Sequence, residues 1–252
     1  MDLQLAGKVA IITGSSKGLG RATALALAAE GVSISLCARG AETLEETRRE
    51  IESAGGRARA TTADLNSPEG CEAVFAAAMQ EFGRVDILVN NVGGADRGDT
   101  DDVWLEAYER NLLAAVRMCR LVVPVMKENG GGAIVHVASI WGRESGGGMQ
   151  YNAAKAAMIS HAKNLALQLG PDNIRVNAVC PGSIRFPGGT WDQRAQADPE
   201  GMAKFVEDNI AMGRFGRAEE VADVITFLCS DRASWVTGAA INIDGGQSHS
   251  NI

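Results

Sequence analysis

The sequence predicts one α/β domain built on a doubly wound parallel sheet with helices on both faces. Short apolar runs alternate with longer Ala-rich or amphipathic stretches along all 252 residues. No linker, repeat or low-complexity segment interrupts this alternation, so residues 1–252 are expected to form a single domain. A chain of this length buries about 70–75% of its unfolded surface, which is enough for a core without disulfide bridges.

Seven short runs are expected to be strands. In chain order they occupy residues 8–14, 32–38, 57–63, 85–91, 133–139, 174–180 and 239–244. Helical stretches lie near residues 18–30, 41–54, 67–82, 100–127, 149–170 and 217–229. Ser67 and Pro68 predict the start of the third helix, because serine is a common cap and proline suits the first helical position. Strands that alternate with helices form βαβ units and hence a parallel sheet.

The longest piece without clear periodicity covers about residues 183–212 and is rich in Gly, Pro, Arg and aromatic residues. In a compact domain, a segment of this length is usually a binding loop or a lid. We therefore expect the substrate loop at 183–212.

Charge and composition argue against several classes of function. A net charge of -7 is unfavourable for nucleic-acid binding, which requires a basic face. The five cysteines are widely spread without a C-x-x-C pair, so we expect a cytoplasmic protein without a disulfide framework or zinc site. No signal peptide or membrane span is expected, because the N-terminus lacks a basic segment and no apolar run approaches about 18 residues. The three histidines share no metal-ligand spacing, so no metal is expected.

A glycine-rich turn, TGSSKGLG at residues 13–20, follows the first expected strand and opens the first expected helix. Gly14, Gly18 and Gly20 permit a tight turn, close approach of a pyrophosphate and close packing of the helix on the sheet. The helix N-terminus adds free N–H groups and the positive end of its dipole. The turn therefore predicts binding of a dinucleotide.

The same turn contains G-x-S-x-G around Ser16, the pattern of the nucleophile elbow of serine hydrolases. His249 follows late in the chain, as the order of such a triad requires. However, a hydrolase elbow follows several strands of its sheet, whereas one expected strand precedes Ser16, and His249 lies in a polar tail. The hydrolase alternative is therefore disfavoured.

Tyr151 and Lys155, in the segment YNAAK, lie four residues apart and thus on one face of a helix. A tyrosine phenol has a pKa of about 10, too high for proton transfer near neutrality. A lysine charge about 5 Å away, at an effective dielectric of about 20, stabilises the phenolate by roughly 3 kcal/mol, or about two pKa units. We expect the pair to act as an acid–base group, although this spacing also occurs by chance on surface helices.

A series of motifs in order makes the chain resemble the short-chain dehydrogenase/reductase family. The motifs are the glycine turn, NNVG at 90–93, Ser139 after the fifth strand, YNAAK, PG at 181–182 and the closing GAAINIDGG. The resemblance covers essentially the whole chain and implies a Rossmann fold. It also implies that residues at the carboxyl ends of separate strands meet at one edge of the sheet.

The resemblance implies catalytic roles for four side chains. Tyr151 resembles the general acid of carbonyl reduction, or the base of alcohol oxidation, and Lys155 resembles the residue that lowers its pKa and holds the nicotinamide ribose. Ser139 would hydrogen-bond to the reacting oxygen, with a capping serine as the alternative. Asn111 matches the family asparagine that holds a water behind the lysine, with a satisfied core amide as the alternative.

The resemblance also implies coenzyme contacts beyond the three glycines. The residues concerned are Ser16, Lys17, Leu19, Arg39, Asp64, Leu65, Asn91, Val92, Gly93, Tyr151, Lys155, Pro181, Gly182 and Ile184. Asp64 resembles the family aspartate that accepts from the adenine amine, with a turn residue as the alternative. Val92 replaces the usual alanine, and Phe186 replaces a frequent threonine that touches the coenzyme, which puts that contact in doubt.

The end of the second strand indicates which coenzyme is used. A fold that selects NAD usually places an acid about 20 residues beyond the glycine turn, and residues 36–40 contain none. Arg39 and Lys17 could instead face a 2′-phosphate, since guanidinium groups bind phosphates in a bidentate way. We expect NADP(H) to be preferred and NAD(H) to be possible, with ordinary surface cations as the alternative.

The substrate is expected to be a small molecule. Trp141, Met149, Phe186 and Trp191 could wall its pocket. Arg97, Arg143 and Arg185 could bind a carboxylate, although a solvated surface role is favoured for each. His136 is expected to be a satisfied core histidine, and His161 to lie at a packing surface.

These observations predict an oxidoreductase that moves a hydride between NADP(H) and a small ketone or secondary alcohol. A 3-oxoacyl reductase and an NAD(H)-dependent alcohol or sugar dehydrogenase are alternatives, as is a nucleotide-binding regulator without catalysis. An acidic carrier protein would dock poorly, because Lys127 is the one cation in the segments MKENGGG and LQLGPDN. The resemblance further implies a homotetramer formed through the helices at 100–127 and 149–170.

Overall fold

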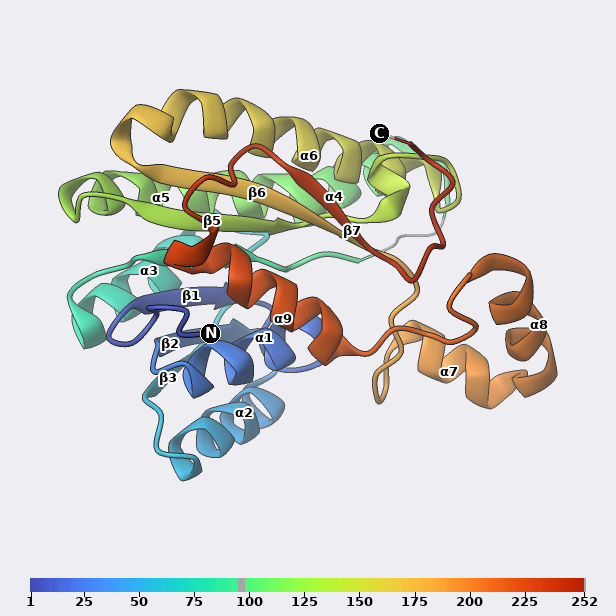
Figure 1. Ribbon diagram of the computed structural model, residues 1–252, viewed down its shortest axis with the longest axis horizontal. Coiled ribbons are helices and arrows are strands. Elements are labelled where there is room, and N and C mark those ends of the chain that lie inside the picture. Colours follow the sequence, from blue (N-terminus) through green and yellow to red (C-terminus); the bar gives the residue numbers. More distant parts are fainter. Residues whose placement is uncertain (95–97, 252) are drawn as a thin grey trace.

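A seven-stranded parallel sheet forms the centre of the protein (Figure 1), and the computed structural model describes residues 1–94 and 98–251. The strands are β1 Val9–Thr13, β2 Ser33–Ala38, β3 Ala58–Thr62, β4 Ile87–Asn90, β5 Gly132–Val137, β6 Ile174–Pro181 and β7 Ala240–Ile243. Their order is β3-β2-β1-β4-β5-β6-β7, and every pair of neighbours is parallel. The predicted fold class is confirmed, and each expected run contains one strand.

Helices cover both faces of the sheet. They are α1 Gly18–Ala29, α2 Ala41–Ser53, α3 Pro68–Phe82, α4 Asp101–Tyr108, α5 Ala114–Glu128, α6 Met149–Leu169, α7 Thr190–Ala197, α8 Pro199–Asn209 and α9 Ala218–Cys229. One buried cluster joins α1, α2 and α9 to the sheet, and another joins α3, α5 and α6 to it. None of the described helices has the length and apolarity that a bilayer crossing requires.

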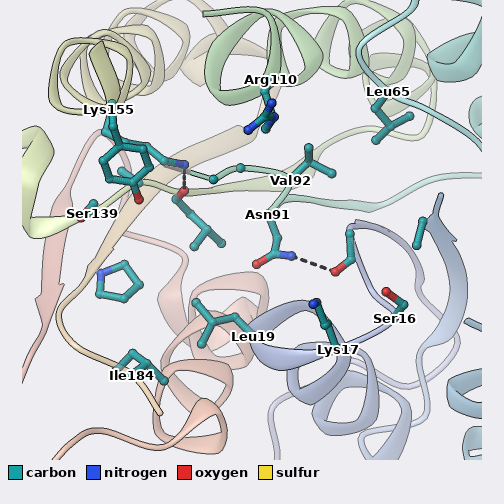
Figure 2. A pocket seen from close by; sticks show the side chains of 18 of the residues that line it. Ser16, Lys17, Leu19, Leu65, Asn91, Val92, Arg110, Ser139, Lys155 and Ile184 are labelled. Atoms are coloured by element: carbon teal, nitrogen blue, oxygen red, sulfur yellow. Dashed lines mark hydrogen bonds between the residues drawn. The ribbon is translucent and has the colours of Figure 1, made fainter. Parts of the chain in front are cut away.

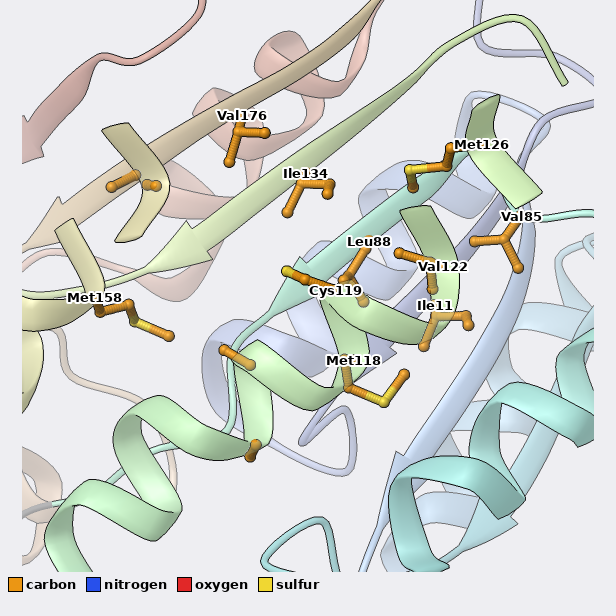
Figure 3. Close-up of a cluster of buried hydrophobic side chains, with 14 of the residues drawn as sticks. Ile11, Val85, Leu88, Met118, Cys119, Val122, Met126, Ile134, Met158 and Val176 are labelled. Carbon is orange, nitrogen blue, oxygen red and sulfur yellow. The ribbon is translucent and has the colours of Figure 1, made fainter. Parts of the chain in front are cut away.

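The cluster beneath α5 shows why the strands read as apolar runs (Figure 3). Ile11, Leu88 and Ile134 come from adjacent strands and are fully buried against Met118 and Val122 of α5. Both faces of a parallel sheet are covered in this way, so its strands lack the alternation of a half-exposed strand.

Two helix details follow local chemistry. The Ser67 hydroxyl accepts a hydrogen bond from the Gly70 N–H at 3.0 Å, and Pro68 occupies the first position of α3, as predicted. The helical stretch expected at 100–127 is instead divided into α4, a π-helical turn Glu109–Leu113 and α5. Such a turn inserts one extra residue into a helix and is frequent at functional sites.

The expected substrate loop is more ordered than its sequence indicates. Within residues 183–212 the chain forms α7 and α8, which stand away from the layers of the sheet (Figure 1). Trp191 stacks on Phe205 with 4.8 Å between ring centroids, and Phe215 lies 5.5 Å from Trp191. The two helices are therefore held by an aromatic cluster of their own. The pattern was missed because neither helix buries an apolar face in the main core.

Candidate active site

The carboxyl ends of the strands surround a cavity of about 580 Å³. Most of the predicted coenzyme contacts line it: Gly14, Ser16, Lys17, Leu19, Arg39, Asp64, Leu65, Asn91, Val92, Gly93, Tyr151, Lys155, Pro181, Gly182 and Ile184. Figure 2 shows Lys155 and Ser139 on one side of this cavity and Ser16 and Lys17 on the other. Parallel topology thus brings residues that are far apart in the sequence to one edge of the sheet.

The glycine turn has the backbone geometry that a pyrophosphate site requires. Gly14 and Gly18 have positive φ angles of 66° and 57°, and a Cβ atom on Gly20 would lie 2.3 Å from the Gly14 carbonyl oxygen. Lys17 caps α1 without a side-chain hydrogen bond, so the first N–H groups of α1 remain available to an anion. The residues present therefore fit a dinucleotide.

Asn91 holds this turn in place. Its Nδ2 donates to the carbonyl oxygens of Thr13 at 2.9 Å and Gly14 at 3.1 Å, and its backbone N–H donates to Thr13 Oγ1 at 2.8 Å. Both side-chain donations thus go to protein acceptors, and Asn91 joins β4 to the turn. This structural role was not foreseen from the sequence.

Phe186 covers one side of the same turn. A Cβ atom on Gly18 would lie 2.6 Å from the Phe186 ring, and one on Gly189 would lie 2.8 Å from it. Phe186 therefore places an aromatic ring directly against the glycine turn.

On the same side of the cavity as the glycine turn, Arg39 and Lys17 are exposed and line the wall. Within the described residues neither side chain forms an ion pair. Asp64 also lines the cavity, and its side chain accepts a hydrogen bond from the Asn66 N–H at 3.1 Å. Both sequence interpretations of Asp64, as a ligand of adenine and as a turn residue, thus agree with its position.

Ser139 lies at the end of β5 and is 6% exposed. Its hydroxyl oxygen accepts a hydrogen bond from the Trp141 N–H at 3.2 Å, so the capping alternative is confirmed as a structural role. The Ser139 hydroxyl also acts to lower the pKa of the Tyr151 phenol, although burial raises that pKa more strongly. Trp141 packs edge-on against Tyr151, with 6.5 Å between ring centroids.

Lys155 lies on the same side of α6 as Tyr151, with its Nζ 5.7 Å from the centre of the tyrosine ring. The ammonium group donates a hydrogen bond to the Val137 carbonyl at 2.8 Å (Figure 2). Burial lowers the pKa of Lys155 to about 8. The predicted adjacency of phenol and amine is therefore present.

The sequence predicts that Lys155 lowers the pKa of Tyr151, and this direction is wrong for the protein without coenzyme. Burial raises the pKa of Tyr151, and the Ser139 hydroxyl only partly opposes this effect. The cost of removing a phenolate from water outweighs its attraction to the lysine charge, and this cost depends on the fold and not on the spacing of the two residues. Burial also lowers the pKa of Lys155 to about 8, so its positive charge is present near neutral pH and is lost as the pH rises through about 8.

Asn111 is fully buried in the π-helical turn. Its Nδ2 donates to the carbonyl oxygens of Gly94 at 3.0 Å and Ala107 at 2.9 Å, and its Oδ1 accepts from the Gly94 N–H at 2.9 Å. Its amide is therefore satisfied, as the core alternative proposed. A Cβ atom on Gly93 would lie 2.9 Å from Asn111 Oδ1 and 3.0 Å from Lys155 Nζ, which places Asn111 beside the lysine.

The residues proposed to bind substrate have different positions. Trp141, Phe186 and Trp191 line the cavity, whereas Met149 is 62% exposed and is not among its lining residues. The guanidinium of Arg143 donates to the Ala240 carbonyl at 2.8 Å and to Asn242 Oδ1 at 2.9 Å.

Arg185 pairs with Asp192 at 3.0 Å, and Arg97 lies outside the described residues. Carboxylate binding by Arg143 or Arg185 is thus disfavoured, because protein partners already hold both groups. Arg110 lines the cavity and was missed, although its place directly before Asn111 could have indicated it.

His136 is a satisfied core residue, as predicted. Its Nδ1 lies 3.1 Å from Asn90 Nδ2, and its Nε2 lies 3.1 Å from Nδ1 of His161. The two rings are stacked with 5.3 Å between centroids. Burial lowers the pKa of His136 to about 3.

Comparison with known proteins shows which families and enzymes this chain is similar to. Residues 14–248 match the family described as enoyl-(acyl carrier protein) reductase. The 3-oxoacyl-(acyl-carrier-protein) reductase of Thermotoga maritima is 36% identical over 250 residues, which cover 97% of this chain and 99% of that protein.

Two solved structures are also similar. The L-sorbose reductase of Gluconobacter frateurii, complexed with NADPH and L-sorbose, has a TM-score of 0.94 and 36% identity over 99% of this chain and 100% of that one. A 7α-hydroxysteroid dehydrogenase, complexed with NADH and 7-oxo glycochenodeoxycholic acid, has a TM-score of 0.91 and 32% identity over 99% of this chain and 97% of that one.

Proposed function

This chain belongs to the short-chain dehydrogenase/reductase family of oxidoreductases acting on CH–OH and C=O groups, and on that premise we propose that it transfers a hydride between NADP(H) and a small-molecule ketone or secondary alcohol. The observation that carries this proposal is the position of Ser139, Tyr151 and Lys155 on one wall of the cavity that also contains the glycine turn. A regulator without catalysis would not need that group of side chains.

The nicotinamide coenzyme supplies or accepts the hydride when bound. In the reductive direction Tyr151 donates a proton to the carbonyl oxygen, and its raised pKa keeps the phenol protonated near neutral pH. The Ser139 hydroxyl hydrogen-bonds to the same oxygen and stabilises the charge that develops there. Lys155 orients and polarises this end of the site, and Asn111 fixes the segment at Gly94 beside it.

The preference for NADP(H) rests on Lys17 and Arg39. Both cations line the cavity and are exposed, and residues 36–40 contain no acid that would repel a 2′-phosphate. Related enzymes have been solved with either NADPH or NADH, so the choice depends on these local charges. Charge-assisted contacts of about 1.5–3 kcal/mol each would give a preference of one to several decades.

The test is kcat/KM with NADPH and with NADH for the wild type and for Arg39→Asp. We expect the wild type to prefer NADPH by at least about tenfold, and Arg39→Asp to abolish or reverse this preference. Arg59→Asp is the matched control, because Arg59 is exposed on β3 and does not line the cavity. A wild-type preference for NADH, or equal use of both coenzymes, would contradict the assignment.

A free small molecule is favoured over an acyl chain on an acidic carrier. Lys127 pairs with Asp172 at 2.7 Å, so the one cation expected near these helix ends is already partly neutralised. The net charge of -7 adds repulsion toward an acidic partner. A panel of free ketones and 3-oxoacyl thioesters, with and without the carrier, distinguishes the two, and a strong preference for the carrier-bound form would overturn this choice.

We also propose a cytoplasmic homotetramer. All five cysteines are free, which suits a reducing compartment. Several large apolar side chains are strongly exposed, including Leu105 of α4 at 69%, Leu167 of α6 at 72% and Trp235 at 98%. Association of subunits would bury such side chains, and family members associate through the corresponding helices.

A further inference from the structure

The tail of the chain, residues 244–251, is hydrogen-bonded to the loop of residues 182–185 that follows β6. Gln247 is 8% exposed, and its Oε1 accepts a hydrogen bond from the Ser183 N–H at 2.8 Å. Beside it, the Gly182 N–H donates to the Ile243 carbonyl at 3.1 Å. A Cβ atom on Gly182 would lie 2.7 Å from Gln247 Oε1, so the absence of a side chain at Gly182 is what allows this close approach.

The same loop is held on its opposite side by the segment that returns from α8. The Gly216 N–H donates to the Ser183 carbonyl at 3.1 Å, and the Arg185 N–H donates to the Gly216 carbonyl at 2.9 Å. The returning segment also bonds to the tail, because the Met212 N–H donates to the Gly245 carbonyl at 3.0 Å. Loop, tail and returning segment therefore form one hydrogen-bonded junction at the edge of the cavity.

Within the loop of residues 182–185, only the backbone N–H of Ile184 has no protein partner in the part of the chain that the structure describes. Gly182, Ser183 and Arg185 each donate their N–H to a protein acceptor. Within residues 1–94 and 98–251, by contrast, neither the N–H nor the carbonyl of Ile184 is hydrogen-bonded to protein. Ile184 also lines the cavity, so these two backbone groups without a protein partner belong to a residue of the cavity wall.

We propose that Gln247 is a positioning residue of the coenzyme site, which fixes the backbone of residues 182–185 so that Ile184 presents its N–H and carbonyl to the nicotinamide end of the coenzyme. The inference rests on the proposed function, because it assumes that Ile184 contacts that end. Without the Gln247 acceptor, the Ser183 N–H would be buried without a partner, and the loop would shift to satisfy it.

Binding of two ligands tests this role. NADPH carries the nicotinamide, whereas 2′-phospho-ADP-ribose is the same molecule without it. Gln247→Met keeps the length of the side chain but removes the acceptor, and it should weaken NADPH binding by roughly five- to a hundredfold. The Kd of 2′-phospho-ADP-ribose should change by less than about twofold, because that ligand does not reach Ile184. Gln247→Glu keeps an acceptor oxygen and should bind NADPH nearly as the wild type does.

Two further variants make the test specific. Gln247→Asn is too short to reach Ser183 and should resemble Gln247→Met, which keeps the test available if the methionine variant does not fold. His249→Ala is the control from the same tail, because His249 contributes a backbone N–H, not its side chain, to its hydrogen bond with Glu144. Urea unfolding of each variant separates a loss of global stability from a loss of binding.

The outcomes separate this inference from the proposed function. Equal losses for NADPH and for 2′-phospho-ADP-ribose, unchanged NADPH binding in Gln247→Met, or a Gln247→Glu variant as defective as Gln247→Met would each overturn the role of Gln247. A wild type that binds neither NADPH nor NADH would instead show that the proposed function is wrong. If NADH binds better, the same selective loss measured with NADH and ADP-ribose still supports the role of Gln247.

Discussion

The Lys155 ammonium lies 5.7 Å from the centre of the Tyr151 ring while it donates a hydrogen bond to the Val137 carbonyl. The lysine is therefore held by β5 at a fixed place beside the phenol. Lys155 is buried and Tyr151 is partly buried, and this burial raises the pKa of Tyr151 and lowers that of Lys155 to about 8. At neutral pH the phenol is therefore protonated, and the amine with its pKa of about 8 is still mostly charged, so the site without coenzyme holds a phenol–ammonium pair and not a phenolate–ammonium pair.

The ionisation of Tyr151 can be measured directly, because Tyr108 is the one other tyrosine in the chain. In Tyr108→Phe, the ultraviolet absorbance change of phenolate formation reports Tyr151 alone. We expect its pKa in the coenzyme-free protein to lie above the ordinary value of about 10. Adding NADP⁺ should lower it, because the oxidised ring is positively charged. A pKa below about 9 without coenzyme would contradict the dominance of burial.

Gly93→Ala should disturb the catalytic end of the cavity. The added Cβ would lie 2.9 Å from Asn111 Oδ1 and 3.0 Å from Lys155 Nζ, so one of these groups must move. Misplacement of a positioned group by about 1 Å can cost up to about a hundredfold in rate, and we expect kcat/KM to fall by at least about tenfold.

Gly94→Ala is the matched control for that change. Its Cβ would meet Arg110 at 3.5 Å, an ordinary contact distance, so kcat/KM should stay within about threefold of the wild type. Equal effects of the two substitutions would show that the closeness of Gly93 to Lys155 is unimportant.

Acid should destabilise the fold through His136. Burial holds the pKa of His136 at about 3, whereas an unfolded histidine titrates near 6.5. The unfolded state therefore binds more protons between these values, and stability falls as the pH decreases from about 6.5 toward 3. From pH 7 to pH 5, His136 alone should lower the free energy of unfolding by about 2 kcal/mol.

Urea unfolding at pH 7 and pH 5 measures this dependence. His136→Gln should show a smaller pH dependence than the wild type, because glutamine does not titrate, whereas His249→Gln should not differ from it. His249 is exposed and serves as the control. An unchanged pH dependence in His136→Gln would contradict the assignment to this buried histidine.

The protein should be a tetramer in solution at micromolar concentration. Leu167 is 72% exposed on α6, one of the two helices expected to form paired bundles. Leu167→Arg should shift the mass measured by light scattering toward smaller species, because it places a charge in an apolar contact. A monomeric wild type would refute the tetramer.

Much of the site could be predicted because a parallel sheet brings the carboxyl ends of all its strands to one edge. Each motif follows a strand, so Gly14, Asn91, Ser139 and Pro181 had to meet once the strands were assigned. The adjacency of Tyr151 and Lys155 followed from helical spacing alone.

What could not be predicted depends on packing. The helices α7 and α8 were missed because their apolar residues pack on one another and leave no stripe facing the sheet. The partners of Arg143 and Arg185 come from residues whose proximity the sequence does not show. The pKa of Tyr151 was assigned the wrong direction because desolvation depends on the surrounding fold, not on the spacing of two residues.

The central claim is that Tyr151 transfers the proton that accompanies hydride transfer, and the most direct test is the turnover of NADPH with a panel of ketones by wild type and Tyr151→Phe. Tyr151→Phe should lose about 10²–10⁴-fold in kcat while its Kd for NADPH stays nearly unchanged, because only the proton donor is removed. Tyr108→Phe should keep wild-type turnover. If Tyr151→Phe retained most of the wild-type activity, the assignment of the proton donor would be wrong.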